Sequence, residues 1–205
     1  MHEQRTESYG QQGATIVDRF GVWLSTRAIL RQIPAHPVDL LDIGCGYHAV
    51  QMRALGSRLR QGVGIDFQID PQLKLLGNMS FLEGDAEESM RRLEGRQFDV
   101  VLMNSVLEHI FDSQGILSLC HRLLRPSGTL LVNVPTWLGK VFLEFSAFRL
   151  GLSPKVEMDD HKMYYGKRDL WPLLVRAGFR PSAMQLKYHK FGLNLFASAR
   201  KSPPA

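Results

Sequence analysis

The stretch Val38–Gly46, which reads VDLLDIGCG, decides the fold. The large apolar residues around Asp39 and Asp42 are typical of a strand that is buried on both faces of a parallel sheet. Gly44 and Gly46 follow the second acid, and because glycine has no β-carbon, the backbone of this turn can approach a ligand closely. A helix-like run over residues 49–59 comes next, so the stretch predicts a nucleotide-binding turn between a strand and a helix.

Outward from this turn, short apolar runs alternate with helical patterns. The expected strands are 38–43, 62–66, 79–82, 97–104, 129–134, 181–188 and 193–199. The expected helices are 15–33, 49–59, 71–76, 113–124 and 167–177, with a turn at 126–128. This alternation predicts an α/β, Rossmann-like, doubly wound and mostly parallel sheet, with ligands at the carboxyl ends of its strands.

The whole chain, residues 1–205, is expected to form a single domain in four segments. These are an N-terminal arm and helix (1–35), a cofactor-binding core (36–135), a substrate-lid insertion (136–166), and a C-terminal helix with strands (167–200). Within the insertion, residues 137–148 have apolar side chains at helical spacing on one face and predict an amphipathic helix. That helix covers a bound substrate, or it packs on the sheet or on a partner chain.

Composition excludes several classes of protein. With 44% hydrophobic and 22% charged residues, the chain resembles an ordinary globular domain. Cys45 and Cys120 are far apart, which indicates neither a disulfide framework nor a zinc site and favours a reducing cytoplasm. No apolar run is long enough to span a bilayer, and residues 1–13 lack the apolar core of a signal peptide, so a cytoplasmic location is expected.

Positive charge is concentrated in the last third of the chain. Residues 1–134 hold 13 Lys and Arg against 15 Asp and Glu, whereas residues 135–205 hold 12 against 5. A nucleic acid, an anionic membrane surface or a phosphorylated substrate would each account for this surplus, and so would a solvated basic surface.

Two further acids stand where strands end. Asp66 lies 20 residues after Gly46, the separation at which a ribose-binding acid is expected in a βαβ unit. The alternative is a surface carboxylate at the end of a strand. Asp85 precedes a helical run and is suited to cap that helix as an acid at its N-terminus.

Taken together, these residues resemble the class I S-adenosylmethionine-dependent methyltransferases over residues 36–135, and more loosely over 167–179 and the strands that follow. The resemblance implies S-adenosyl-L-methionine as cofactor and an antiparallel last strand. It also implies roles for single residues. The methionine part of the cofactor would be held by Asp42, Gly44, Cys45 and Gly46, with Asn104 and Ser105 beside it. The ribose hydroxyls would be bound by Asp66, and the adenine would be flanked by Phe67 and bound by an acceptor on Asp85 and a backbone donor on Ala86.

The phrase Leu107–Ile110, LEHI, resembles the branch that includes quinone-biosynthesis and sugar or natural-product methyltransferases. This implies a small-molecule acceptor, with a hydroxyl of a lipid-linked, anionic, sugar or quinone-like compound as the methylated group. Peripheral membrane contact is compatible with it. One departure is His48, which replaces the usual third glycine, so either the backbone there is not in a glycine-only conformation or the cofactor sits differently.

Methyl transfer depends mainly on positioning and on exclusion of water. A hydroxyl acceptor also benefits from a base, and His109 is the first candidate because the end of the fourth strand faces the cofactor. The alternative is that His109 only packs there or orders the loop. His161 is the second candidate, or else an exposed loop histidine. Asp159 and Asp160 next to it lack further ligands, so no metal site is expected.

Three rival readings remain. A nicotinamide-dependent oxidoreductase uses a similar turn, but this turn lacks the three-glycine spacing. A methyltransferase acting on nucleic acid would explain the basic surplus, yet Asn104–Leu107, NSVL, lacks the proline and aromatic residue that stack a flipped base, so nucleic acid is not expected as a partner. A non-catalytic cofactor-binding or scaffold protein also stays open.

Overall fold

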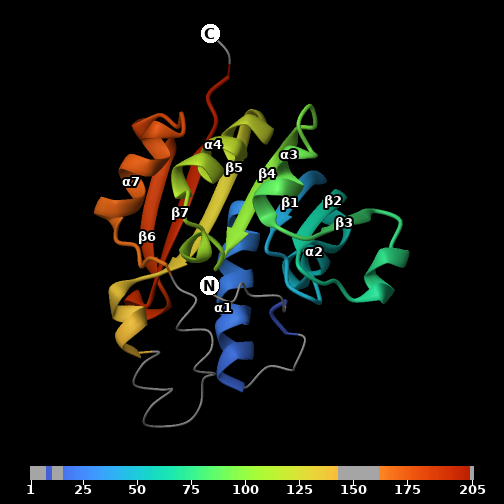
Figure 1. Cartoon of the computed structure of the whole chain (residues 1–205), viewed down its shortest axis with the longest axis horizontal. Helices are drawn as coiled ribbons and strands as arrows, with labels where there is room; N and C mark the ends of the chain where they lie inside the picture. The colour runs from blue at the N-terminus through green and yellow to red at the C-terminus, as the bar shows by residue number, and fades with distance from the viewer. Residues whose placement is uncertain (1–7, 11–15, 143–161, 204–205) are drawn as a thin grey trace.

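The computed structural model describes residues 8–10, 16–142 and 162–203. Its centre is a seven-stranded sheet in the order β3-β2-β1-β4-β5-β7-β6 (Figure 1). The strands are β1 Val38–Ile43, β2 Leu59–Asp66, β3 Met79–Glu83, β4 Phe98–Asn104, β5 Leu124–Pro135, β6 Met184–His189 and β7 Asn194–Arg200. Neighbours from β3 to β5 pair in parallel, and β7 runs antiparallel to both β5 and β6. The predicted Rossmann-like α/β fold with an antiparallel last strand is therefore confirmed.

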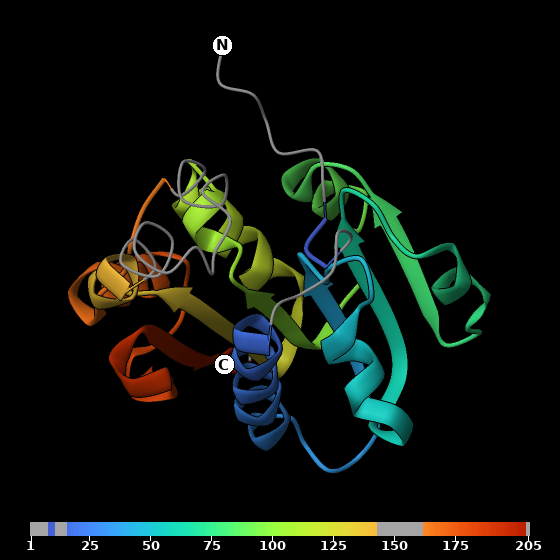
Figure 2. The same ribbon diagram turned by 90° about the horizontal axis from the view of Figure 1, so that it is seen from below.

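Helices cover both faces of the sheet, as Figure 2 shows. On one face lie α1 Ile16–Gln32 and α2 Val50–Leu55, and on the other lie α3 Ala86–Arg91, α4 Ser113–Leu123 and α7 Lys167–Arg176. Residues 137–142 are also helical. The short 3₁₀ turns are η1 Gly56–Arg58, η2 Pro71–Leu75, η3 Leu107–His109, η4 Pro181–Ala183 and η5 Lys190–Gly192.

The central strands are buried on both faces, as the run at 38–43 predicts. Val101 and Met103 of β4 belong to the core under α3, α4 and α7. The alternate residue Leu102 belongs to the core under α1 and α2, together with Leu40 of β1. Each such side chain contributes on the order of 1.5–3 kcal/mol on burial. The sheet is thus a rigid platform whose strand ends can hold a site.

Several predicted boundaries were wrong for local reasons. The helix expected over 49–59 ends at Leu55, because Gly56 takes a positive φ of 53°, and β2 begins at Leu59. The helix expected at 71–76 is the shorter 3₁₀ turn η2. The turn expected at 126–128 lies within β5 as an irregularity: Ser127 has a φ of 64° and its N–H donates to Lys201 O at 3.0 Å.

Candidate functional site

Asp42 is the next-to-last residue of β1 and is the least expected charge in the core. Its side chain is 1% exposed, and within the described residues neither carboxylate oxygen accepts a hydrogen bond. Burial raises the pKa of Asp42 well above its usual range, and the nearby Asp66 charge adds to the effect. An unpartnered buried carboxyl is costly. The site therefore suits a ligand that brings a hydrogen-bond donor or a positive charge to this carboxyl.

The glycine turn after Asp42 is held against the end of β2. Gly44 and Gly46 have φ values of 69° and 75°, a region that residues with a β-carbon rarely adopt. The N–H groups of Gly44 and Cys45 donate to Ile65 O at 2.8 and 3.1 Å. A β-carbon on Gly44 would stand 2.2 Å from Val106 Cγ2, so the backbone passes directly beneath that side chain.

Asp66 is joined to the glycine turn across 20 residues of sequence. One carboxylate oxygen accepts from Gly46 N at 2.7 Å, and the other accepts from Phe67 N at 2.8 Å. The second oxygen also accepts from the Ser8 hydroxyl, which in turn accepts from Gln68 N at 2.7 Å. The structure therefore places two of the predicted cofactor residues, Gly46 and Asp66, in direct contact.

Ser8 lies in the predicted N-terminal arm and was not among the predicted site residues. It is 4% exposed, and the next residue, Tyr9, accepts a hydrogen bond from Tyr47 N at 3.0 Å. Nothing in the local sequence distinguishes Ser8 from the other polar residues around it. Its position depends on a contact with residues about 60 positions away, which periodicity cannot show.

His48 does not take a glycine-only backbone conformation, which is the first of the two alternatives expected for this position. His48 is not among the residues with positive φ; the left-handed residue is Ala49, with a φ of 45°. The His48 ring lies 3.5 Å from the Asp70 carboxylate, measured from Nδ1 to Oδ2. The left-handed backbone conformation therefore falls on Ala49, one residue after His48.

Phe67, Asp85 and Ala86 lie at the ends of β2 and β3, which are neighbouring strands. Gly84 N donates to Asp66 O at 3.0 Å, so the segment before α3 sits beside the ribose candidate. Asp85 caps α3, its Oδ1 accepting from Glu88 N at 3.0 Å, as the cap reading predicts. The cap uses one carboxylate oxygen. Phe67 is 39% exposed.

Asn104 and Ser105 end β4 on the side covered by α1. Asn104 Oδ1 accepts from Asn133 Nδ2 at 2.9 Å, and Ser105, with a φ of 59°, donates its N–H to Asn133 O at 2.8 Å. Asn133 is fully buried in β5 and also contacts Ser25 Oγ of α1 at 3.4 Å. Sequence reasoning missed Asn133, although a single amide within the apolar run 129–134 was a usable signal.

The two candidate bases stand differently. His109 is partly buried in η3, where its backbone N–H donates to Val106 O at 2.9 Å. His161, like Asp159 and Asp160, lies outside the described residues. Glu108 is an additional buried acid that sequence reasoning missed: it is 1% exposed, and its backbone oxygen accepts from Lys162 N at 2.7 Å.

Large apolar side chains surround this end of the molecule on three elements: α1, the helical residues 137–142, and η5. We call these residues the apolar rim: Phe20, Trp23, Trp137, Leu138, Val141, Phe142 and Phe191, each more than 45% exposed. Phe20 and Trp23 stack with ring centroids 5.8 Å apart. A β-carbon on Gly192 would lie 3.4 Å from Leu138 Cδ2, so η5 and residues 137–142 are in contact. Of the amphipathic helix expected at 137–148, residues 143–148 lie outside the described part.

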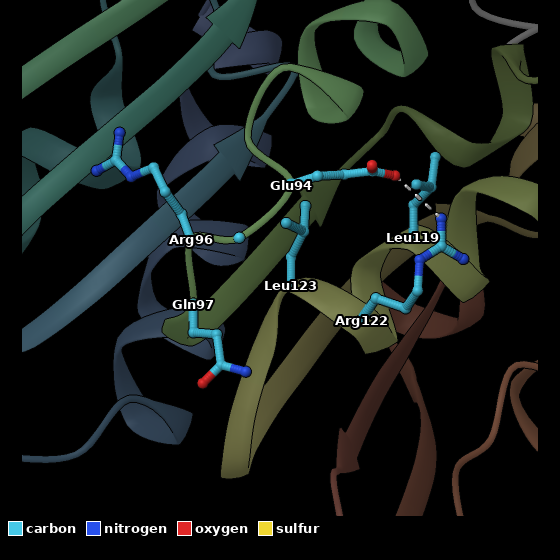
Figure 3. A pocket seen from close by; sticks show the side chains of 7 residues that line it. Glu94, Arg96, Gln97, Leu119, Arg122 and Leu123 are labelled. Atoms are coloured by element: carbon cyan, nitrogen blue, oxygen red, sulfur yellow. Dashed lines mark ion pairs between the residues drawn. The ribbon is translucent and has the colours of Figure 1, made fainter.

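The opposite end of the sheet holds a different feature. A hollow of about 280 Å³ is lined by Glu94, Gly95, Arg96, Gln97, Leu119, Arg122 and Leu123. Glu94 and Arg122 form an ion pair there at 3.7 Å, drawn as a dashed line in Figure 3. It lies at the start of β4, away from Asp42 and Asn104. Nearby, Arg125 bridges Asp39 and Asp99 at 2.6 and 2.8 Å, which ties the amino ends of three strands together. This end has a structural role.

Comparison with known proteins finds methyltransferases over the part of the chain that contains this site. The profile of a family described as "Methyltransferase domain" matches residues 41–132. The ubiquinone biosynthesis O-methyltransferase of Pseudomonas aeruginosa is 31% identical over 111 residues, 51% of this chain and 47% of the relative. That of Dinoroseobacter shibae is 32% identical over 158 residues, 72% of this chain and 62% of the relative. The chain thus spans about half the length of the first of these curated relatives and somewhat more of the second.

Solved structures show the same fold at low identity. A SAM-dependent methyltransferase from Archaeoglobus fulgidus superposes with a TM-score of 0.67 at 16% identity, covering 93% of this chain and 96% of that one. An O-methyltransferase family protein from Burkholderia thailandensis gives 0.63 at 18% identity, covering 88% and 56%. Residues 41–132 match the methyltransferase-domain family, and the fold is that of the class I S-adenosylmethionine-dependent methyltransferases.

The match to this family implies S-adenosylmethionine as methyl donor. The residues present fit that molecule. The unpartnered carboxyl of Asp42 matches the positive charge of its methionine part, and the positive-φ glycines leave the backbone accessible. Within the described ranges no group of three His, Cys, Asp or Glu side chains is arranged to hold a metal ion.

Proposed function

We propose that this chain transfers a methyl group from S-adenosylmethionine to a hydroxyl of a small, largely apolar acceptor. The observation that carries the proposal is the buried Asp42 carboxyl, which has no partner among the described residues and lies beside the glycine turn. In this proposal Asp42, Gly44, Cys45 and Gly46 hold the methionine part, with Asn104 and Ser105 beside it. Asp66 binds the ribose hydroxyls, and Phe67, Asp85 and Ala86 bind the adenine.

The acceptor enters across the apolar rim. Seven large side chains exposed on three adjoining elements exceed the scattered exposure that is usual on a protein surface, and such patches mark sites for apolar ligands or membranes. The relatives named ubiquinone biosynthesis O-methyltransferases support a quinone-like or lipid-linked acceptor. Within the described residues no helix has the length and apolar character to cross a bilayer. Contact with a membrane would therefore be made by this rim, from the surface.

The chemistry is mainly positioning. S-adenosylmethionine, when bound by Asp42 and the glycine turn, would supply an electrophilic methyl group for transfer to an acceptor oxygen. The rigid ends of β1 and β4 fix the two reactants relative to one another. His109, at the end of η3, is the proposed group that takes the hydroxyl proton, and His161 is the second candidate.

A transfer assay tests the proposal. The full chain is incubated with S-adenosylmethionine carrying a labelled methyl group and with catechols bearing alkyl chains of increasing length. Matched arms contain alkylamines and duplex DNA. We expect label in the catechols, rising with chain length, and none in DNA; Asp66→Ala serves as the variant deficient in cofactor binding. Labelling of DNA or of amines alone would contradict the proposed acceptor class, and no transfer to any arm would favour a non-catalytic binding protein.

A further inference from the structure

The hairpin between β6 and β7 is strained. Lys190 and Phe191 in η5 have φ values of 49° and 57°, two consecutive non-glycine residues in the left-handed region. Each costs roughly 1–2 kcal/mol in this conformation. Thr136 imposes it: its hydroxyl lies 2.7 Å from Gly192 O and its N–H donates to Leu193 O at 2.9 Å. Strain held in place by its surroundings is characteristic of functional positions.

The strained turn directs two neighbouring side chains in opposite directions. Phe191 is 91% exposed and joins the apolar rim. Lys190 is partly buried and turns inward, with Nζ 3.7 Å from the point where a β-carbon on Gly21 would stand. That distance is an ordinary van der Waals contact, so the Lys190 ammonium packs against the face of α1 that carries Gly21.

Among the described residues, Glu108 is the carboxylate whose charge acts on this ammonium group. Burial lowers the pKa of Lys190 to about 8, and Glu108 opposes that change only through its longer-range field. Within the described part of the chain no carboxylate makes a hydrogen bond to the ammonium. A cation removed from water without an adjacent counter-ion is unfavourable, and a bound anion would relieve the cost.

The ammonium lies on the acceptor side of the candidate site. In the sheet, His189 pairs with Asn194 and Asn194 pairs with Pro135, so η5 stands at the same end as the Asn104–Asn133 pair. Ser25, which contacts Asn133, follows Gly21 by about one helical turn, roughly 6 Å along α1. Lys190 is therefore about one turn of α1 away from the residues at the end of β4.

We propose that the Lys190 ammonium binds an anionic oxygen of the methyl acceptor, whose apolar part lies against the apolar rim. The acceptor is then an amphipathic acid, with a carboxylate or an ionised phenol at its inner end. The inference rests on the proposed function, because it takes this space to be the acceptor site. It adds the charge of the acceptor and the residue that recognises it.

Paired probes of equal tail length test the charge preference. Octanoate and 1-octanol are titrated calorimetrically into the full chain at pH 7, where the carboxylate is ionised. We expect octanoate to bind wild type about tenfold tighter than octanol. Lys190→Met should abolish that preference and Lys190→Arg should keep most of it. Lys187→Met, which removes an exposed lysine of β6, is the matched control and should bind as wild type does.

Titration of the same proteins with S-adenosylmethionine separates the two proposals. Unchanged affinity in Lys190→Met, together with loss of the octanoate preference, supports the role of Lys190. An octanoate preference that is absent in wild type, or that survives in Lys190→Met, would overturn it. Failure of wild type to bind S-adenosylmethionine would instead overturn the proposed function, and the octanoate titration would still decide whether Lys190 binds anions.

Discussion

Replacing Gly44 by alanine should be the most damaging single change in the glycine turn. At a φ of 69° an alanine costs about 1–2 kcal/mol relative to glycine. Its β-carbon would also stand 2.2 Å from Val106 Cγ2, well inside a normal carbon–carbon contact of about 3.5–4 Å. Overpacking of this kind adds about 1–3 kcal/mol. The expected loss in unfolding free energy is therefore about 2–5 kcal/mol.

Two matched variants separate the strain from the clash. Gly46→Ala has a similar φ of 75°, but the nearest atom to its β-carbon is Tyr9 O at 3.3 Å, so about 1–2 kcal/mol is expected. Val106→Ala combined with Gly44→Ala removes the clashing methyl group and should recover the overpacking part. Urea denaturation of wild type, Gly44→Ala, Val106→Ala and the double variant, treated as a double-mutant cycle, measures the overpacking part, and Gly46→Ala in the same assay measures the strain. Equal losses for Gly44→Ala and Gly46→Ala, or no coupling with Val106, would refute this explanation.

Three other predictions concern separate parts of the chain. The hydrogen bond from Arg60, opposed by burial and helped by Arg125, lowers the pKa of Asp39 to about 2. Asp39→Asn should therefore lose about 2 kcal/mol of stability at pH 5–7 in urea denaturation. Because the folded pKa is depressed, that difference should shrink as pH falls below the usual pKa of 3.8 and vanish near pH 2; a difference independent of pH would argue against the ion pairs. Ser8→Ala removes one of the two hydrogen bonds that an Asp66 oxygen accepts, so S-adenosylmethionine should bind about 2- to 10-fold tighter by calorimetry. Weaker binding would mean that Ser8 supports the site. If His109 is the base, His109→Gln should slow methyl transfer about 10²- to 10⁴-fold and leave the cofactor affinity unchanged. An unchanged rate of methyl transfer would mean that His109 only packs in the site.

Local patterns predicted the sheet because its central strands are buried on both faces. The apolar runs at 38–43 and 97–104 predicted two such strands, and the structure has them. The spacing of 20 residues predicted that Asp66 binds ribose, which stays a prediction, and the structure adds that its carboxylate accepts from Gly46 N. Helix ends were less predictable. Gly56 ends α2 through a positive φ, which its position inside an apolar helical pattern concealed.

Contacts between distant segments could not be read from the sequence. Ser8 reaches Asp66, and Thr136 fixes the turn at Lys190 and Phe191, across 54 or more positions in each case. Such contacts depend on which strands become neighbours in the sheet. No local motif predicts that β7 lies between β5 and β6. The roles assigned to Asp42, Asp85 and the other cofactor residues stay predictions.

The most direct test of the cofactor site is a calorimetric titration of wild type and Asp66→Ala with S-adenosylmethionine, S-adenosylhomocysteine and NAD. We expect micromolar binding of both sulfur compounds, no heat with NAD, and a loss of about 1–3 kcal/mol in Asp66→Ala, whose carboxylate would otherwise accept from the ribose hydroxyls. Binding of NAD without the sulfur compounds, or sulfur-compound affinity unchanged in Asp66→Ala, would contradict the site described at the ends of β1 and β2.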